Sequence, residues 1–231
     1  MFVRMMLIAV LGWWATSAVA ATIPLMNPDF EQVEPGDPLM PGGFGAFNGS
    51  ILGWTDPGNF QQAGTFAPNA LAYPGGSSNV AFITNATITQ SVGTIAADTS
   101  YTLSADIGNR LRASSPEGSV AGFFVGSTDG DSFLFPILSP EDGTFDRQEF
   151  TVSAEQLSDF VGQPLLIAFR ADRPQLNLDN VVLEATQTVV PLPPAALLLG
   201  GALVALGLRQ RLLPGRREDA PKRLTGSDRG A

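Results

Sequence analysis

The sequence predicts an all-β domain, a jelly-roll β-sandwich, followed by one C-terminal transmembrane helix. Between residues 22 and 186, short runs of β-branched and aromatic residues alternate with turns rich in glycine and proline. About ten such runs with long connections are typical of a jelly roll. From Val189 to Leu208, twenty residues carry no charge, which is about the length that crosses a bilayer.

Residues 1–20 are typical of a secretory signal peptide. Arg4 supplies the positive start, residues 5–14 the apolar run, and Ala18-Val19-Ala20 the small-residue cleavage pattern. We therefore expect residues 22–186 to lie outside the cytoplasm, as a single exported domain. An uncleaved N-terminal anchor is the alternative.

The exported domain begins, in this prediction, with an edge strand at 25–31 that Pro28 interrupts. Long loops rich in glycine and proline follow at 33–50 and 56–78, separated by a short apolar anchor at 51–54. Long loops of β-sandwiches often bind ligands, so this region is a candidate for function.

Clearer strands follow in the second half of the domain. Residues 100–107 alternate best between apolar and polar side chains, which predicts a sheet with one wet face. The more continuously apolar runs at 119–125 and 133–138 are expected to be central strands. The remaining predicted strands are 79–84, 87–92, 148–152, 165–170 and 176–184, with a short helical turn at 154–161. In the last strand, Asp179, Val181 and Leu183 are predicted to share one face.

Missing residue types exclude much of the usual catalytic chemistry. The chain has no cysteine and no histidine, so disulfides, zinc-thiolate sites and Ser-His-Asp triads are excluded. Its only lysine, Lys222, lies in the C-terminal tail, which excludes a Schiff base in the exported domain. Carboxylate pairs are the main catalytic arrangement that remains.

The exported part is strongly acidic. Residues 22–188 contain 19 acidic and five basic side chains, a net charge of −14. Such a surface repels nucleic acid, so no nucleic-acid partner is expected. It suits calcium, neutral sugars, or simply solubility.

Glu31 and Asp179 are the candidate metal ligands. If the first and last strands are neighbours, the two carboxylates converge with backbone carbonyls, and hard oxygen ligands of this kind suit calcium. The alternative is an aspartate that caps a turn and a solvated glutamate. The sequence establishes no cofactor beyond this expectation of a structural Ca²⁺.

Four other side chains are candidate ligand-binding residues. Trp54 and Tyr73, in the long-loop region, could stack on sugar rings, although core packing is the more common role of such residues. Arg110 and Arg112 follow the 100–107 strand and could bind a carboxylate or an acidic sugar. Surface pairing with nearby acids is the alternative for the two arginines.

The C-terminal stretch resembles the PEP-CTERM sorting signals of bacteria, in a Val-Pro-Leu-Pro variant. The resemblance rests on the motif Val190-Pro191-Leu192-Pro193, an apolar run, and then Arg209 and Arg211, over residues 189–211. It implies a membrane helix that stops at the two arginines and processing by an exosortase. The tail, 212–231, is basic and thus expected to be cytoplasmic. Its length departs from the family pattern and leaves a plain membrane anchor as the alternative.

The exported domain is similar to galactose-binding-like, carbohydrate-binding-module jelly rolls. The matching features are 27–31, Gly53-Trp54, 90–107 and 178–181. The resemblance implies a structural calcium between the first and last strands, which fits Glu31 and Asp179.

These observations together predict a non-enzymatic protein of the cell surface or exopolysaccharide matrix that binds glycan. We expect it to be anchored first in the inner membrane of a Gram-negative-type bacterium and then displayed or released. One alternative is a glycan-active enzyme with two carboxylates about 5–9.5 Å apart. Another is a purely structural matrix protein.

Overall fold

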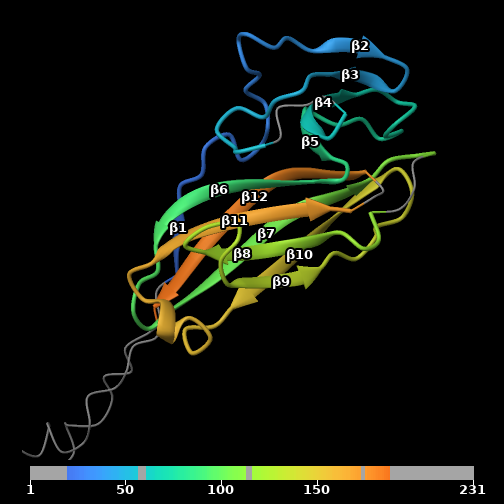
Figure 1. The fold of residues 1–231 in the computed structure, drawn as a ribbon. Coiled ribbons are helices and arrows are strands. Elements are labelled where there is room, and N and C mark those ends of the chain that lie inside the picture. The colour runs from blue at the N-terminus through green and yellow to red at the C-terminus, as the bar shows by residue number, and fades with distance from the viewer. Residues whose placement is uncertain (1–19, 57–60, 113–115, 173–174, 188–231) are drawn as a thin grey trace, which may run out of the picture. The chain divides into compact units, whose positions relative to one another are not determined.

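A computed structural model describes residues 20–56, 61–112, 116–172 and 175–187. They form two antiparallel β-sheets packed face to face, which confirms the predicted all-β sandwich (Figure 1). The predicted membrane segment lies outside the described residues. Among those that are described, no helix is long and apolar enough to cross a membrane.

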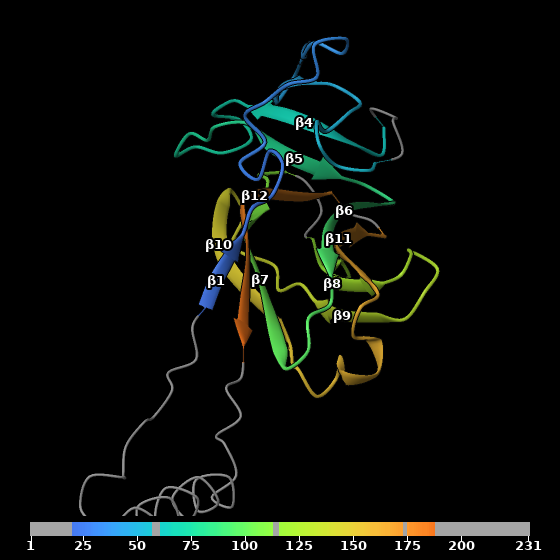
Figure 2. The same ribbon diagram turned by 90° about the vertical axis from the view of Figure 1, so that its left-hand side faces the viewer.

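The larger sheet has the strand order β10-β7-β12-β5-β4-β3-β2, and β1 pairs with β12 beside this path. In Figure 2 its strands β1, β10, β7 and β12 form the left-hand layer. Its strands are β1 (Ala20–Ile23), β2 (Met40–Gly42), β3 (Gly45–Phe47), β4 (Ala63–Pro68), β5 (Val80–Ile83), β7 (Thr99–Asn109), β10 (Thr144–Val152) and β12 (Leu176–Gln187).

The smaller sheet has the order β6-β11-β8-β9 and forms the right-hand layer of Figure 2. Its strands are β6 (Ala86–Thr94), β8 (Val120–Val125), β9 (Ser132–Pro136) and β11 (Pro164–Ala171). A short 3-10 turn, η1 (Ser158–Phe160), precedes β11 and falls within the predicted helical turn.

The core lies between the two sheets. Leu103, Ala105 and Ile107 of β7 are fully buried there, as are Ile167 and Phe169 of β11. The alternation seen at 100–107 is therefore confirmed, because every second residue of β7 faces the smaller sheet.

The predicted first strand at 25–31 is wrong. The first strand is β1, which pairs with β12, while 25–31 consists of turns in which Asn27 and Phe30 have φ of 45° and 54°. The side-chain amide of Asn27 bonds to the backbone of Gln32 in both directions, at 3.0 Å each, and this favours a turn over a strand. The apolar Phe30 is an anchor that packs on Trp54, with ring centroids 5.7 Å apart.

Two further predictions need correction. The run at 133–138 forms β9, which is an edge strand, whereas the other apolar run forms β8 in the interior of the smaller sheet. The rings of Phe133 and Phe135 are half-buried and pack on Phe160 and Phe150, so they cover the rim of the core. The loop predicted at 33–50 contains β2 and β3, which extend the larger sheet.

The parity predicted for β12 is also wrong. The pairing of β12 with β7 shifts register between Asp179 and Val182, and Asn180 has a φ of 49°. This bulge turns Val181 and Leu183 into the core and leaves Asp179 on the outer face, opposite Asp106. Sequence alternation did not reveal the bulge because it adds a residue to an otherwise regular strand.

Gly108 of β7 is required for close packing on the outer face of the larger sheet. A Cβ at this position would lie 2.5 Å from the hydroxyl oxygen of Tyr73 and would also clash with the ring of Phe145. We predict that Gly108→Ala lowers the free energy of unfolding by about 1–3 kcal/mol, as overpacking does. Urea unfolding measures this, with Gly75→Ala as control because no atom lies within 4 Å of its added Cβ. Equal effects of the two substitutions would contradict the packing argument.

Candidate functional site

The outer face of the larger sheet carries a second apolar cluster, separate from the core. Its buried members are Phe66, Ala72, Tyr73, Val80 and Phe82. These side chains come from β4, β5 and the loop between these two strands. The β4–β5 loop therefore covers part of a sheet face that would otherwise contact solvent.

Tyr73 is the most deeply buried polar side chain of this cluster. Its ring stacks on Phe145 at 4.5 Å between centroids, and its hydroxyl donates to Oδ1 of Asn177 at 3.0 Å. Burial raises the pKa of the Tyr73 phenol, and the nearby positive charge of Arg110 lowers it to a smaller extent. Tyr73 is therefore a neutral donor that holds Asn177, a fully buried residue of β12.

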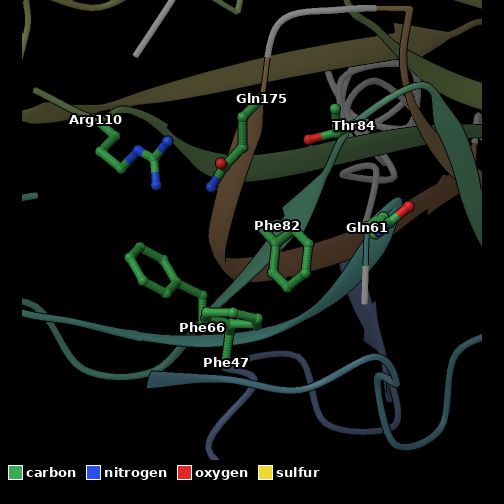
Figure 3. A pocket seen from close by; sticks show the side chains of 7 residues that line it. All are labelled: Phe47, Gln61, Phe66, Phe82, Thr84, Arg110 and Gln175. Atoms are coloured by element: carbon green, nitrogen blue, oxygen red, sulfur yellow. The ribbon is translucent and has the colours of Figure 1, made fainter. Parts of the chain in front are cut away.

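A pocket of about 180 Å³ opens beside this cluster (Figure 3). In the close-up, Arg110, Gln175 and Thr84 lie along one side and three phenyl rings along the other. The lining residues are Phe47, Gln61, Phe66, Phe82, Thr84, Arg110 and Gln175. The pocket thus combines apolar rings with one cationic group and neutral hydrogen-bonding groups.

Arg110 is held firmly at the end of β7. The side chain of Asn109 donates to Pro140 O at 3.0 Å and to Asp142 Oδ1 at 2.9 Å, and Leu111 N donates to Ala72 O at 3.0 Å. The residues on both sides of Arg110 are therefore fixed by contacts with other loops.

The guanidinium of Arg110 lies over two aromatic rings. Its central carbon is 4.8 Å from the ring centroid of Phe44 and 6.0 Å from that of Phe66. Burial lowers the pKa of Arg110, and its Nε is buried without a hydrogen-bond partner in the described part of the chain. The pocket is therefore lined by a half-buried cation, and the Nε of that cation has no hydrogen-bond acceptor among the described residues.

Asp179 lies next to this cluster on the same face. It is only 7% exposed, and its carboxylate accepts bonds from Asn180 N at 2.7 Å and Ser78 Oγ at 3.3 Å. Burial raises the pKa of Asp179 to about 6, against the lowering effect of these two bonds, and the negative charges of Asp106 and Glu31 raise it further. Asp179 is therefore a carboxyl group that titrates near neutral pH.

Arg147 forms its ion pair with the neighbouring Asp106. It pairs with Asp106 at 3.1 Å and donates to Ser104 Oγ at 2.7 Å. Asn180 Nδ2 also donates to Asp106, at 2.9 Å. Asp106 is thus held in place beside the more buried Asp179.

The structure brings Glu31 and Asp179 to one short segment. Glu31 Oε1 accepts from Asn79 N at 3.0 Å, next to the Ser78 hydroxyl that bonds to Asp179. In the described ranges, however, no group of three or more acidic side chains is arranged to hold a metal ion.

The pocket and Asp179 lie along the same stretch of chain at β12, although Asp179 does not line the pocket. Asn177 and Asp179 are two residues apart on the same face, roughly 7 Å along the strand. Gln175, which lines the pocket, donates to Asn177 Oδ1 at 3.4 Å. The order along this strand is therefore pocket, buried amide, carboxyl.

Of the four predicted ligand-binding residues, two come together. Tyr73 and Arg110 are close enough to shift each other's pKa. Trp54 instead packs in the core against Phe30 and Phe169, and Arg112 is exposed. The predicted sorting and membrane-stop residues lie outside the described residues: Val190, Pro191, Leu192, Pro193, Arg209 and Arg211.

Sequence reasoning missed most of the other site residues. Phe47 comes from a short strand inside a predicted loop, whereas Phe82 and the buried amide of Asn177 lie in predicted strands whose outer faces gave no sign of a site. The missed residues are Phe47, Phe82, Asp106, Arg147, Gln175 and Asn177.

A second hollow, of about 600 Å³, lies over the smaller sheet. Its lining is rich in hydroxyl groups, including those of Thr87 and Thr89, and its arginine, Arg170, is paired with the exposed Asp172. This hollow lacks the buried acid and the partnerless cation of the first site. We therefore take the pocket at Arg110 and the adjacent Asp179 as the candidate functional site.

The fold and site define a β-sandwich with a buried acid beside an aromatic pocket. The family model of the HpiC1-like proteins, described as HpiC1 cyclase, matches residues 21–184. The chain therefore belongs to the HpiC1-like family. No curated protein matches the chain.

Solved cyclase structures share the fold. An apo cyclase from Fischerella sp. has 21% identity and a TM-score of 0.56, over 74% of this chain and 98% of that one. A cyclase from Fischerella sp. TAU has 19% identity and a TM-score of 0.57, over 74% and 100%. The Stig cyclase Fisc, solved with (3Z)-3-(1-methyl-2-pyrrolidinylidene)-3H-indole, has 21% identity and a TM-score of 0.55, over 72% and 98%.

Membership of this family corrects the prediction of a non-enzymatic glycan-binding protein of the surface or exopolysaccharide matrix. The matching family is described as a cyclase family. This description also replaces the two alternatives, a structural matrix protein and a glycan-active enzyme. The error has a chemical reason. Missing histidine and cysteine exclude triads and thiolates, but they do not exclude chemistry that needs only a carboxylic acid.

The raised pKa of Asp179 predicts a dependence of stability on pH. Its folded-state pKa of about 6 lies above the ordinary value of 3.8, so the stabilisation is full below about pH 3.8 and is lost as pH rises through 6. We predict that wild type loses roughly 2 kcal/mol of unfolding free energy relative to Asp179→Asn between pH 4 and 7. Urea unfolding of both chains across this range measures the difference, in which other titrations cancel. Parallel curves would contradict the prediction.

Proposed function

We propose that this protein is a cyclase that closes a ring in a small, unsaturated substrate bound in the aromatic pocket. Asp179 is the proposed proton donor. The observation that carries this proposal is a buried carboxyl group with a raised pKa on the same sheet face as the pocket, four residues along the chain from the pocket-lining Gln175, in a chain of the HpiC1-like family. An acid with a pKa near the working pH is the effective kind of general acid.

The chemistry proposed for Asp179 is acid-initiated ring closure. The carboxyl O–H gives its proton to one carbon of a substrate double bond, and the electron pair of that bond forms the new C–H bond. A second double bond then attacks the resulting cation and closes the ring through a C–C bond. Loss of a proton to the Asp179 carboxylate restores the acid, so the product is an isomer of the substrate.

The surroundings of Asp179 suit the positive charge of such a reaction. Asp106 and Glu31 raise its pKa through their negative charge, and the same charge favours a cation beside the carboxyl group. Aromatic faces in the pocket give further stabilisation to a cation. The Fisc structure holds an indole-containing compound, which supports an aromatic or conjugated substrate here as well.

A panel of acyclic dienes that carry an aromatic ring tests this function. We predict products of unchanged mass with a new ring by NMR, and one deuterium gained from D₂O during protonation. Asp179→Asn is expected to lower the rate about 10²–10⁴-fold. The wild-type rate should fall as pH rises through about 6, where Asp179 loses its proton.

The matched control for this assay is Asp172→Asn, which changes an exposed carboxylate that pairs with Arg170. It should leave the rate unchanged. An Asp179→Asn chain with the wild-type rate, or a panel in which nothing is isomerised, would overturn the proposed function.

The same carboxylates support an alternative proposal, a structural calcium ion at Glu31 and Asp179. Backbone carbonyls and water would complete the coordination that calcium needs. The two proposals exclude each other at Asp179, because calcium would keep its carboxylate ionised. A calcium site predicts a melting temperature that rises with Ca²⁺, falls with chelator, and no longer responds in Glu31→Gln. A melting temperature that does not change with calcium or chelator would exclude the calcium site and would leave the role of proton donor as the proposal for Asp179.

We also propose that the domain is exported and anchored in a membrane. The signal-like residues 1–20 and the uncharged stretch from Val189 to Leu208 support this on sequence grounds. The family match, at 21–184, lies between these two segments.

A further inference from the structure

Arg110 has a hydrogen-bonding capacity that the described part of the protein does not use. Its Nε is buried and has no partner, and the ion pairs among described residues join Arg147 to Asp106 and Arg170 to Asp172. A buried N–H without an acceptor costs free energy, and so does a desolvated charge. The rings of Phe44 and Phe66 compensate for the charge but offer no acceptor to the N–H.

The direction of Arg110 indicates where such an acceptor would come from. Its guanidinium lines the pocket and lies on the same side as Gln175, across from the phenyl rings (Figure 3). Asn109 and Leu111 fix the backbone on either side of it. The buried Nε is closed to a ligand, but the guanidinium also lines the pocket, where its other N–H groups can donate to an acceptor on a ligand.

We propose that the pocket binds a flat, unsaturated carboxylic acid, with its carboxylate on Arg110 and its body among Phe47, Phe66 and Phe82. This inference rests on the proposed function and names the substrate class of the same site. A planar guanidinium matches a carboxylate through two parallel N–H···O bonds.

Charge selects a single carboxylate over a more highly charged group. Residues 22–188 have a net charge of −14, so the domain repels anions in general. Arg110 is the one cation that lines this pocket among the described residues, whereas a diphosphate requires several positive groups.

Charge also fixes the orientation of the ligand. Arg110 is the charged residue of the pocket lining, and the other lining residues are phenylalanines and neutral polar side chains. The carboxylate of the ligand therefore lies at Arg110, and its unsaturated body lies among the phenyl rings.

The test compares trans-cinnamate with trans-cinnamamide, which has nearly the same shape and no charge. Isothermal titration of the full chain in mild detergent is expected to show at least ten-fold tighter binding of cinnamate. Arg110→Gln should abolish that preference. Arg112→Gln removes an exposed charge only two residues away and should keep it, which separates a specific contact from a general effect of charge.

Equal affinity of the acid and the amide for wild type would overturn the inference, and so would a preference that survives in Arg110→Gln. If Arg110→Gln fails to fold, as a thermal melt would show, Arg110→Lys takes its place. A lysine cannot make the two parallel bonds, so a folded Arg110→Lys chain that keeps the full preference for cinnamate would also overturn the inference.

Neither probe contains a second alkene for ring closure, so binding is measured apart from turnover. Selective binding of cinnamate without any cyclisation of the dienes would overturn the proposed function and leave the binding site intact. Cyclisation without selectivity for cinnamate would overturn only the present inference.

Discussion

The structure depends on β12 being covered on both faces. Leu178, Val181 and Leu183 fill the core, while Asn177 and Asp179 of the same strand point outward. In many antiparallel sandwiches an outer face meets water, but here the β4–β5 loop and its aromatic side chains cover part of it. Every polar group that this loop buries requires a hydrogen-bond partner, and the candidate site consists of the groups that meet this requirement to different degrees.

The polar groups beneath the cover meet the requirement to different degrees. Tyr73 and Asn177 satisfy each other, so they fix the position of the covering loop. Asp179 is bonded but desolvated, and its pKa rises to about 6. Arg110 is desolvated over two rings and keeps an N–H unpaired. The cost of burying Asp179 and Arg110 is only partly offset by hydrogen bonds. Asp179 therefore keeps a raised pKa, and Arg110 keeps an N–H without an acceptor.

This arrangement explains how a chain without histidine, cysteine or a lysine in the domain can belong to a family of cyclases. Ring closure by proton addition and proton loss needs one acid of suitable pKa and a shaped apolar surface. In the proposed reaction, a buried aspartate beside like charges would supply the first and phenylalanine rings the second. Burial raises the pKa of that aspartate most, and the negative charges of Asp106 and Glu31 raise it further.

The sequence by itself determined the class of fold and most strands of its second half, because alternation and turn residues act locally. It also singled out Glu31, Asp179, Tyr73 and Arg110 as chemically notable. Only the tertiary structure decided their roles. The bulge at Asn180 reverses the face of Asp179, and the packing of distant segments brings Tyr73 close to Arg110. Faces, burial and desolvation depend on contacts between residues far apart in the chain, which no local pattern encodes.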